Sequence, residues 1–83
     1  MERQGYCSPR ALSLMFPNSH KDYEIRALTR KAVSPLPHVK HGSKRPVVVI
    51  HPAVYALYLQ WEQGLISYEQ VVDRARRYLT EVR

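Results

Sequence analysis

The sequence predicts a small, mainly helical domain with one β-hairpin: two short N-terminal helices, the hairpin, and a C-terminal pair of helices. Length is the first observation, because 83 residues suffice for one hydrophobic core and one domain. A β-branched run from Val47 to Ile50 follows a Gly42-Ser43 turn signal, which is typical of a hairpin. Helix-start signals also recur along the chain, at Ser8-Pro9, Asn18-Ser19, His51-Pro52 and Ser67.

The first helix is expected to be short. Ser8 can cap its orphan amides, and Pro9 suits the first helical position because its φ is fixed and its missing amide proton is not needed there. Pro17 ends the helix. One face is apolar, with Leu12, Met15 and Phe16 at helical spacing.

A second helix is predicted over residues 20–31, capped by Ser19. Ile25 and Leu28 mark its buried stripe, and its cationic side chains lie mainly on other faces. Two short helices joined by a brief turn, the second of them basic, indicate a helix-turn-helix.

The hairpin is predicted between Leu36 and His51. Residues 40–45 at its tip are almost wholly cationic and polar, which suits contact with something negative. Alternate side chains of a strand point to opposite sides, so one of two pairs in the return strand must face the core. The two pairs are Val47 with Val49, and Val48 with Ile50.

Two helices should follow the hairpin. The first runs from Pro52 to about Gln63, and its aromatic residues are expected to pack in the core rather than to form a stacking platform for single-stranded nucleic acid. The second is predicted over residues 67–83, starting with a capping box between Ser67 and Gln70.

Charge is segregated along the chain, whose net charge is +6. Residues 1–50 hold nine Lys/Arg and three Asp/Glu, whereas residues 51–83 hold four of each. The basic half is therefore the half with the hairpin. Such asymmetry points to a polyanionic partner, with nucleic acid ahead of an anionic membrane or an acidic protein.

Composition also argues against several classes. Cys7 is the single cysteine, so no intramolecular disulfide can form and a cytoplasmic location is expected. No leader or membrane-spanning run is recognisable. We expect no enzyme, since no catalytic or phosphate-binding motif is present, and no cofactor. His38, His41 and His51 lack a cysteine or carboxylate partner, so they are not expected to bind a metal.

Several segments together resemble the excisionase family, whose small winged helix-turn-helix proteins are related to MerR-type DNA-binding domains. The similar residues are Tyr6-Cys7-Ser8-Pro9 with Leu12 and Phe16, Ile25-Arg26-Ala27-Leu28 with Arg30, Leu36 to Gly42, Val48 to Pro52, and Val54 with Leu57 and Leu59. Residues 1–5 are expected to form a flexible N-terminus, and the resemblance implies a DNA-binding domain at residues 6–62. Residues 63–83 lie beyond the family's minimal domain and are expected to pack on the core or to mediate self-association.

The resemblance also implies a function. The second helix would enter the major groove, where Arg26 and Arg30 are the candidates for base contacts, and the hairpin would be a wing along the backbone. Phosphates would be contacted by the remaining polar and basic residues of the site, namely Lys21, Lys31, Lys40, His41, Ser43, Lys44 and Arg45. Family members bind and bend the attachment-site DNA of a phage or mobile element, often as several copies, and aid its integrase.

Three alternatives stay open. The chain could be a small transcriptional regulator of similar build. It could instead be a phage-type or antitoxin-like inhibitor that blocks a host protein through its basic surface. In a third alternative, residues 47–83 would form a ribbon-helix-helix dimer, whose strand would pair with that of a second copy.

Overall fold

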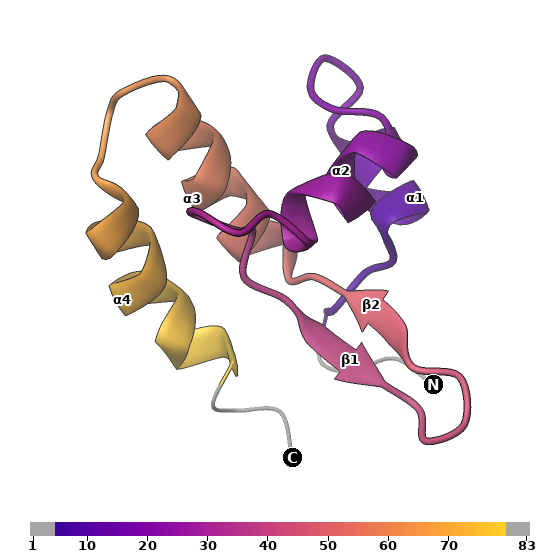
Figure 1. Cartoon of the computed structure of the whole chain (residues 1–83). Coiled ribbons are helices and arrows are strands. Elements are labelled where there is room, and N and C mark those ends of the chain that lie inside the picture. Colours follow the sequence, from indigo (N-terminus) through magenta and orange to yellow (C-terminus); the bar gives the residue numbers. More distant parts are fainter. Residues whose placement is uncertain (1–4, 80–83) are drawn as a thin grey trace.

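The computed structural model describes residues 5–79, in which four helices and a two-stranded antiparallel hairpin follow the predicted order. The elements are α1 (Pro9–Met15), α2 (Asp22–Thr29), β1 (Val39–His41), β2 (Val47–Val49), α3 (Pro52–Glu62) and α4 (Tyr68–Leu79). Figure 1 shows α3 between α4 and the α1–α2 pair, with the hairpin extending away from the helices. The predicted mainly helical class with a small hairpin is confirmed.

Three predicted helix starts are confirmed by their caps. The Oγ of Ser8 accepts the amide of Ala11 at 3.2 Å, and the Nδ1 of His51 accepts an amide of α3 at 3.0 Å. Ser67 and Gln70 form the predicted capping box, with each side chain accepting the other residue's amide at 3.2 Å. These contacts are local along the chain, which is why the sequence alone reveals them.

The start of α2 was predicted wrongly. The helix begins at Asp22 rather than at residue 20, and Ser19 does not cap it. The Oγ of Ser19 donates instead to a carbonyl at the end of α1, at 2.7 Å. Lys21 is the N-cap residue, and its amide donates to the Glu24 carboxylate at 2.7 Å.

Two other helix ends differ from the prediction. α2 ends at Thr29 rather than at residue 31, because the amides of Arg30 and Lys31 bond to carbonyls three residues back, a tighter turn than that of an α-helix. α4 was predicted to run to residue 83. It is described to Leu79, and residues 80–83 lie outside the described part, as do residues 1–4 of the predicted flexible N-terminus.

The hairpin pairs Val39 with Val49, and Lys40 with Val48. β2 ends one residue earlier than predicted, because Ile50 pairs instead with Cys7, with N–O distances of 2.9 and 2.8 Å. The strand therefore finds its partners within its own chain. This arrangement does not match the ribbon-helix-helix alternative, which needs the same strand for pairing with a second copy.

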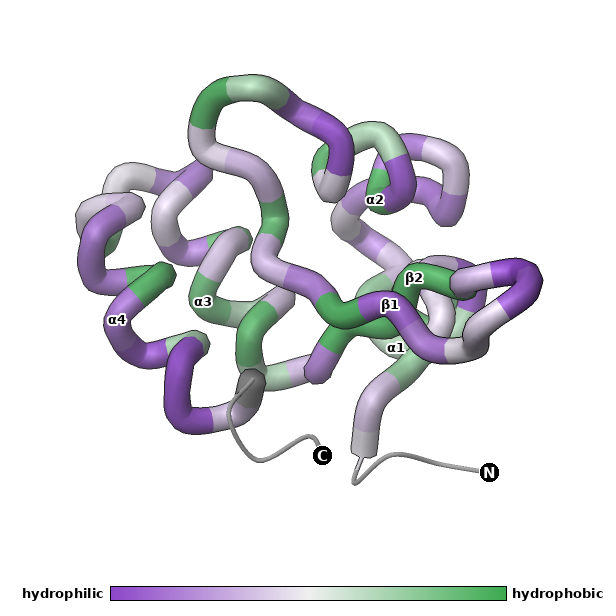
Figure 2. Tube along the Cα trace, turned by 60° about the horizontal axis from the view of Figure 1, so that its bottom comes forward, coloured by the Kyte–Doolittle hydropathy of each residue, from purple (hydrophilic) through white to green (hydrophobic). Residues whose placement is uncertain are grey.

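One face of β2 belongs to the core. Ile50 is fully buried and Val48 packs against the core, whereas Val47 is 57% exposed. Of the two possible pairs, Val48 with Ile50 thus faces inward. Figure 2 shows the contrast along the hairpin, where the apolar β2 follows a hydrophilic tip.

The core lies between α3 and the other elements. Its fully buried members come from every helix, from β2 with its extension, and from the loop before β1: Leu12, Ile25, Leu36, Ile50, Tyr55, Tyr58 and Val71. The predicted core packing of the α3 aromatics is confirmed for Tyr55 and Tyr58, while Trp61 is partly buried at the edge. No helix within residues 5–79 is long and apolar enough to cross a membrane.

Candidate functional site

A cleft of about 370 Å³ lies between α2 and the hairpin. It brings together three of the predicted site residues: Arg26 of α2, Arg30 directly after α2, and Lys40 of β1. The remaining lining residues are mostly small, apolar or neutral polar: Ser8, Pro9, Thr29, His38, Pro46, Val47 and Val48. Helix and hairpin thus present their cations to a single hollow.

The local structure explains why these side chains meet. Ile25 and Thr29 are buried, and the next residues, Arg26 in α2 and Arg30 at its C-terminal cap, lie four residues apart and are exposed on one side. On the hairpin, Lys40 pairs with the core-facing Val48, and directly opposed residues of two strands share a face. Lys40 therefore lies on the side of the hairpin that faces the helices.

The cleft is electropositive. Its lining includes Arg26, Arg30 and Lys40 but no carboxylate. Within residues 5–79 none of these three cations forms an ion pair. Nearby like charges without counter-ions make an anion-attracting surface, because an incoming anion relieves their mutual repulsion.

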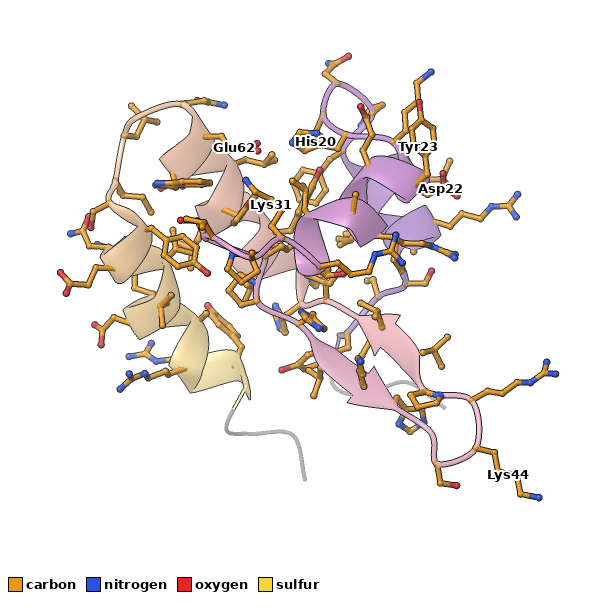
Figure 3. All side chains as sticks on the ribbon, in the orientation of Figure 1. His20, Asp22, Tyr23, Lys31, Lys44 and Glu62 are labelled. Carbon is orange, nitrogen blue, oxygen red and sulfur yellow. The ribbon has the colours of Figure 1, made fainter. Side chains whose placement is uncertain are left out.

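The hairpin tip carries the next group of predicted site residues. His41, Ser43, Lys44 and Arg45 are all exposed, and Lys44 points away from the body of the protein (Figure 3). Gly42 makes the turn possible with a φ of +104°, a conformation that other residues rarely adopt. The tip continues the positive surface beyond the cleft.

Two predicted site residues do not join this surface. The Nζ of Lys31 lies 5.7 Å from the centroid of the Trp61 ring, in a cation–π contact with α3, and Figure 3 shows it far from Lys44. Lys21 lies at the start of α2, whose first turn contains Asp22 and Glu24. Neighbouring carboxylates partly cancel its field.

Sequence reasoning missed one residue that lines the cleft and one that lies on the same side of α2 as Arg26. Tyr23 is 64% exposed on α2, three residues before Arg26 and seven before Arg30, so it shares their side of the helix. Its exposure could have been predicted, because helical spacing places Tyr23 on the side of α2 opposite the buried Ile25. His38 lines the cleft, and its Nδ1 lies 3.0 Å from the carbonyl oxygen of Leu36. No sequence pattern predicts this contact.

A second cleft, of about 670 Å³, lies between the α1–α2 turn and α3. Unlike the cleft between α2 and the hairpin, this one is lined by two carboxylates, those of Glu24 and Glu62, together with His20. The Nε2 of His20 lies 2.8 Å from the Oε1 of Glu62. Among the described residues, no three His, Cys, Asp or Glu side chains are grouped so that they could hold a metal ion.

Comparison with known proteins gives no assignment. No family model matches the chain, and no curated protein or solved structure is significantly similar to it. A functional assignment therefore depends on the geometry and charge of the cleft and of the hairpin tip.

Proposed function

We propose that the chain is a sequence-specific double-stranded DNA-binding protein of the winged helix-turn-helix type, with α2 as recognition helix and the β1–β2 hairpin as wing. The observation that carries this proposal is the cleft between the two elements. It holds three cations without ion-pair partners among the described residues, and no carboxylate. A helix and a hairpin that share a positive surface fit the phosphate-lined grooves of a duplex.

Base contacts are assigned to Arg26 and Arg30. An α-helix fits the major groove, and a guanidinium group can donate two hydrogen bonds to the O6 and N7 of guanine. Arg26 lies in the C-terminal half of α2 and Arg30 directly follows its last residue, whereas Asp22 and Glu24 occupy its first turn. Repulsion between these carboxylates and phosphate favours a pose in which the C-terminal half lies deeper in the groove.

Phosphate contacts are assigned to the wing. Lys40, Lys44 and Arg45 are exposed along it, and His41 and Ser43 can add hydrogen bonds to phosphate oxygens. Lys21 and Lys31 are secondary candidates. The charge of Lys21 is partly cancelled by the carboxylates in the first turn of α2, and Lys31 is held over the Trp61 ring on the α3 side, away from the wing.

The finer role proposed is that of an excisionase, a recombination directionality factor of a phage or mobile element. It rests on the resemblance of the sequence to that family. In this role the protein acts in the cytoplasm without a cofactor and catalyses no reaction itself. It binds and bends attachment-site DNA, associates with further copies there, and aids the integrase. A small transcriptional regulator is the first alternative, and an inhibitor of a host protein that acts through the same basic surface is the second.

The decisive experiment is fluorescence anisotropy with a labelled duplex from the gene's own genomic neighbourhood and a scrambled duplex, titrated at several salt concentrations. Tighter binding to the native duplex with a steep salt slope would support a sequence-reading DNA-binding protein. Failure to bind either duplex at low salt would overturn the proposal and favour the inhibitor. Where binding is found, DNA bending together with stimulation of excision by the neighbouring integrase separates the excisionase from a regulator.

A further inference from the structure

The loop between α2 and β1 is held by two tyrosine hydroxyl groups. Tyr58 of α3 donates to the carbonyl of Ser34 at 3.0 Å, and Tyr68 of α4 donates to the carbonyl of Pro35 at 2.5 Å. The two acceptors are consecutive residues, while the two donors come from different helices. The loop is therefore attached to the C-terminal helical pair at adjacent points.

Other contacts fix the same loop. The side chain of Leu36 is fully buried, and its amide donates to the carbonyl of Leu28 at 3.0 Å. Ser34 has a φ of +54°, which a residue with a side chain adopts at some cost unless its surroundings impose it. The hydrogen bond from Tyr58 to the Ser34 carbonyl is one such constraint.

Trp61 keeps the two tyrosine rings in place. Its ring lies 5.1 Å from that of Tyr58 and 5.4 Å from that of Tyr68, measured between centroids. Lys31, near the start of the loop, contacts the same tryptophan. Its Nζ lies 5.7 Å from the centroid of the Trp61 ring. The aromatic cluster thus contacts the loop near its start, at Lys31, and at its middle, at Ser34 and Pro35.

We infer that Tyr58 and Tyr68 are positioning residues for DNA binding: by bracing this loop they fix the separation between the recognition helix and the wing. The inference rests on the function proposed above. The loop is the direct covalent connection between α2 and β1. Arg26 lies in α2, Arg30 is the first residue of the loop, and Lys40 lies in β1. A braced loop presents both sets of cations at one spacing before DNA arrives, so binding loses less conformational entropy.

This assignment also gives α4 a role. α4 packs on α3 and contributes Val71 and Ala75 to the core, but its outer residues do not line the cleft. Through the Tyr68 hydroxyl it reaches the loop that sets the cleft's width. α4 lies beyond the minimal domain of the excisionase family, which the sequence resembles. In this role it would affect DNA binding without contacting DNA.

The test uses the double variant Tyr58→Phe/Tyr68→Phe, which keeps both rings and removes both hydroxyls. The matched control is Tyr6→Phe, because the Tyr6 hydroxyl also donates to a backbone carbonyl, that of Tyr78, at 2.6 Å, away from the cleft. Each protein is titrated with the native and the scrambled duplex at a temperature at which it is fully folded. Hydrogen exchange of the Leu36 amide reports on the loop without DNA.

We expect the double variant to bind the native duplex about tenfold more weakly than the wild type, the size expected for loss of one or two net hydrogen bonds. Discrimination against the scrambled duplex should fall as well, and the Leu36 amide should exchange faster. Tyr6→Phe should keep wild-type affinity and wild-type exchange at Leu36. A general effect of losing a tyrosine hydroxyl would instead weaken binding in the control as well.

The outcomes separate the inference from the proposed function. If the wild-type protein binds neither duplex, the proposed function is overturned, and the positioning role falls with it. If the wild type binds and the double variant matches it in affinity and in discrimination, the positioning role alone is overturned. The same conclusion follows if Tyr6→Phe weakens binding as much as the double variant does.

Discussion

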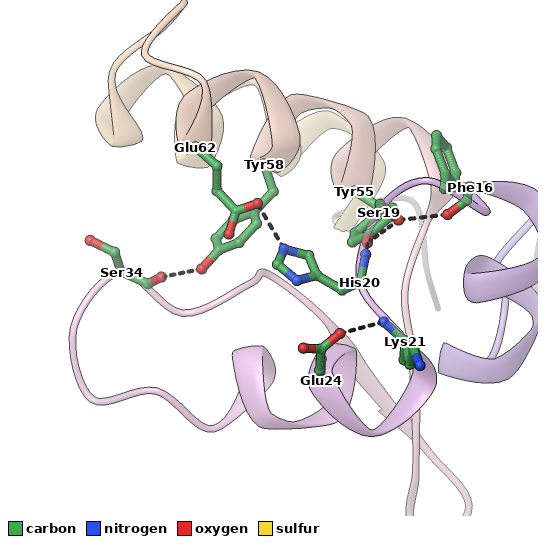
Figure 4. A network of polar contacts seen from close by, with 9 residues as sticks. All are labelled: Phe16, Ser19, His20, Lys21, Glu24, Ser34, Tyr55, Tyr58 and Glu62. Atoms are coloured by element: carbon green, nitrogen blue, oxygen red, sulfur yellow. Dashed lines mark hydrogen bonds and ion pairs between the residues drawn. The ribbon is translucent and has the colours of Figure 1, made fainter.

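The hydroxyl of Tyr55 lies 2.8 Å from the Oγ of Ser19, and this contact joins α3 to the turn between α1 and α2 (Figure 4). Ser19 donates its only hydroxyl proton to the Phe16 carbonyl at 2.7 Å, so Tyr55 must be the donor toward Ser19. The amide of His20 donates to the same tyrosine oxygen at 3.3 Å. The buried hydroxyl of Tyr55 therefore bonds to two consecutive residues of the α1–α2 turn, Ser19 and His20.

Replacing Tyr55 by Phe should lower the free energy of unfolding by about 1 to 3 kcal/mol, because it leaves polar groups of the turn without their partner in a buried place. Urea denaturation measures the change. Tyr23→Phe is the matched control, since Tyr23 is 64% exposed, and it should stay within about 0.5 kcal/mol of the wild type. Equal effects of the two substitutions would contradict the structural role of the Tyr55 hydroxyl.

Stability should fall at alkaline pH because of Tyr58. Burial, with a smaller contribution from the negative charge of Glu62 and then from Tyr68, raises the pKa of Tyr58 from 10.0 to about 12. Between these two values the unfolded chain loses the phenolic proton while the folded chain keeps it. The unfolded state then binds fewer protons, so the free energy of unfolding decreases as pH rises through this window.

The pKa of Tyr68 is also raised by burial, so it adds to the decrease in the same direction. Urea denaturation at pH 9 and at pH 11 measures the slope. Tyr58→Phe should give a shallower loss of stability between these two values than the wild type. An unchanged slope would show that Tyr58 ionises equally easily in both states.

The two arginines of the cleft should control sequence discrimination. Arg26→Ala or Arg30→Ala should lower the free-energy difference between native and scrambled duplexes by about 1 to 3 kcal/mol, the value of a bidentate contact to guanine. Anisotropy titrations with both duplexes measure it. An equal loss of affinity on every sequence would mean that these residues contact phosphates and that α2 does not read bases.

The hairpin tip should act through charge alone. Lys44→Glu should weaken binding to all duplexes to a similar degree and flatten the dependence of affinity on salt, because fewer counter-ions are released from the DNA. Arg74→Glu makes the same charge change on the exposed side of α4 and should leave the salt slope nearly unchanged. If both variants alter the slope alike, net charge rather than the tip governs binding.

The sequence predicted those parts of the fold that depend on neighbouring residues. The caps at Ser8, His51 and Ser67 involve partners two or three residues away, and the Gly42 turn lies between the strands that it joins. Local chemistry of this kind is readable from spacing. Most of the candidate site could be predicted as well, because exposed cations on a basic helix and on a hairpin tip are visible in the sequence.

The features that were not predicted depend on contacts between residues that are far apart in the sequence. Ser19 could have capped α2, but Tyr55, 36 residues later in the chain, fixes it in the turn instead. Lys31 stays a predicted phosphate contact, but its position over the Trp61 ring of α3 was not predicted. The spacing of residues along one helix cannot reveal which element from elsewhere will cover it, and so these two assignments required the three-dimensional structure.

Gly42 should prove essential to the wing for two separable reasons. Its φ of +104° disfavours any residue with a Cβ, and a Cβ placed there would lie 3.2 Å from the Arg45 carbonyl oxygen. Gly64 has a φ of +80° but nothing within 4 Å of such a Cβ, so Gly64→Ala isolates the backbone term. We expect Gly64→Ala to cost about 1 kcal/mol in the free energy of unfolding and Gly42→Ala to cost more.

The two alanine variants should also differ in DNA binding. Gly42→Ala distorts the turn that carries Lys44 and Arg45, so it should reduce affinity for native and scrambled duplexes alike, whereas Gly64→Ala lies in the α3–α4 turn and should keep wild-type affinity. Anisotropy measured well below both unfolding temperatures separates binding from stability. Wild-type affinity in Gly42→Ala, with the hairpin shown by NMR to be altered, would mean that DNA does not contact the tip.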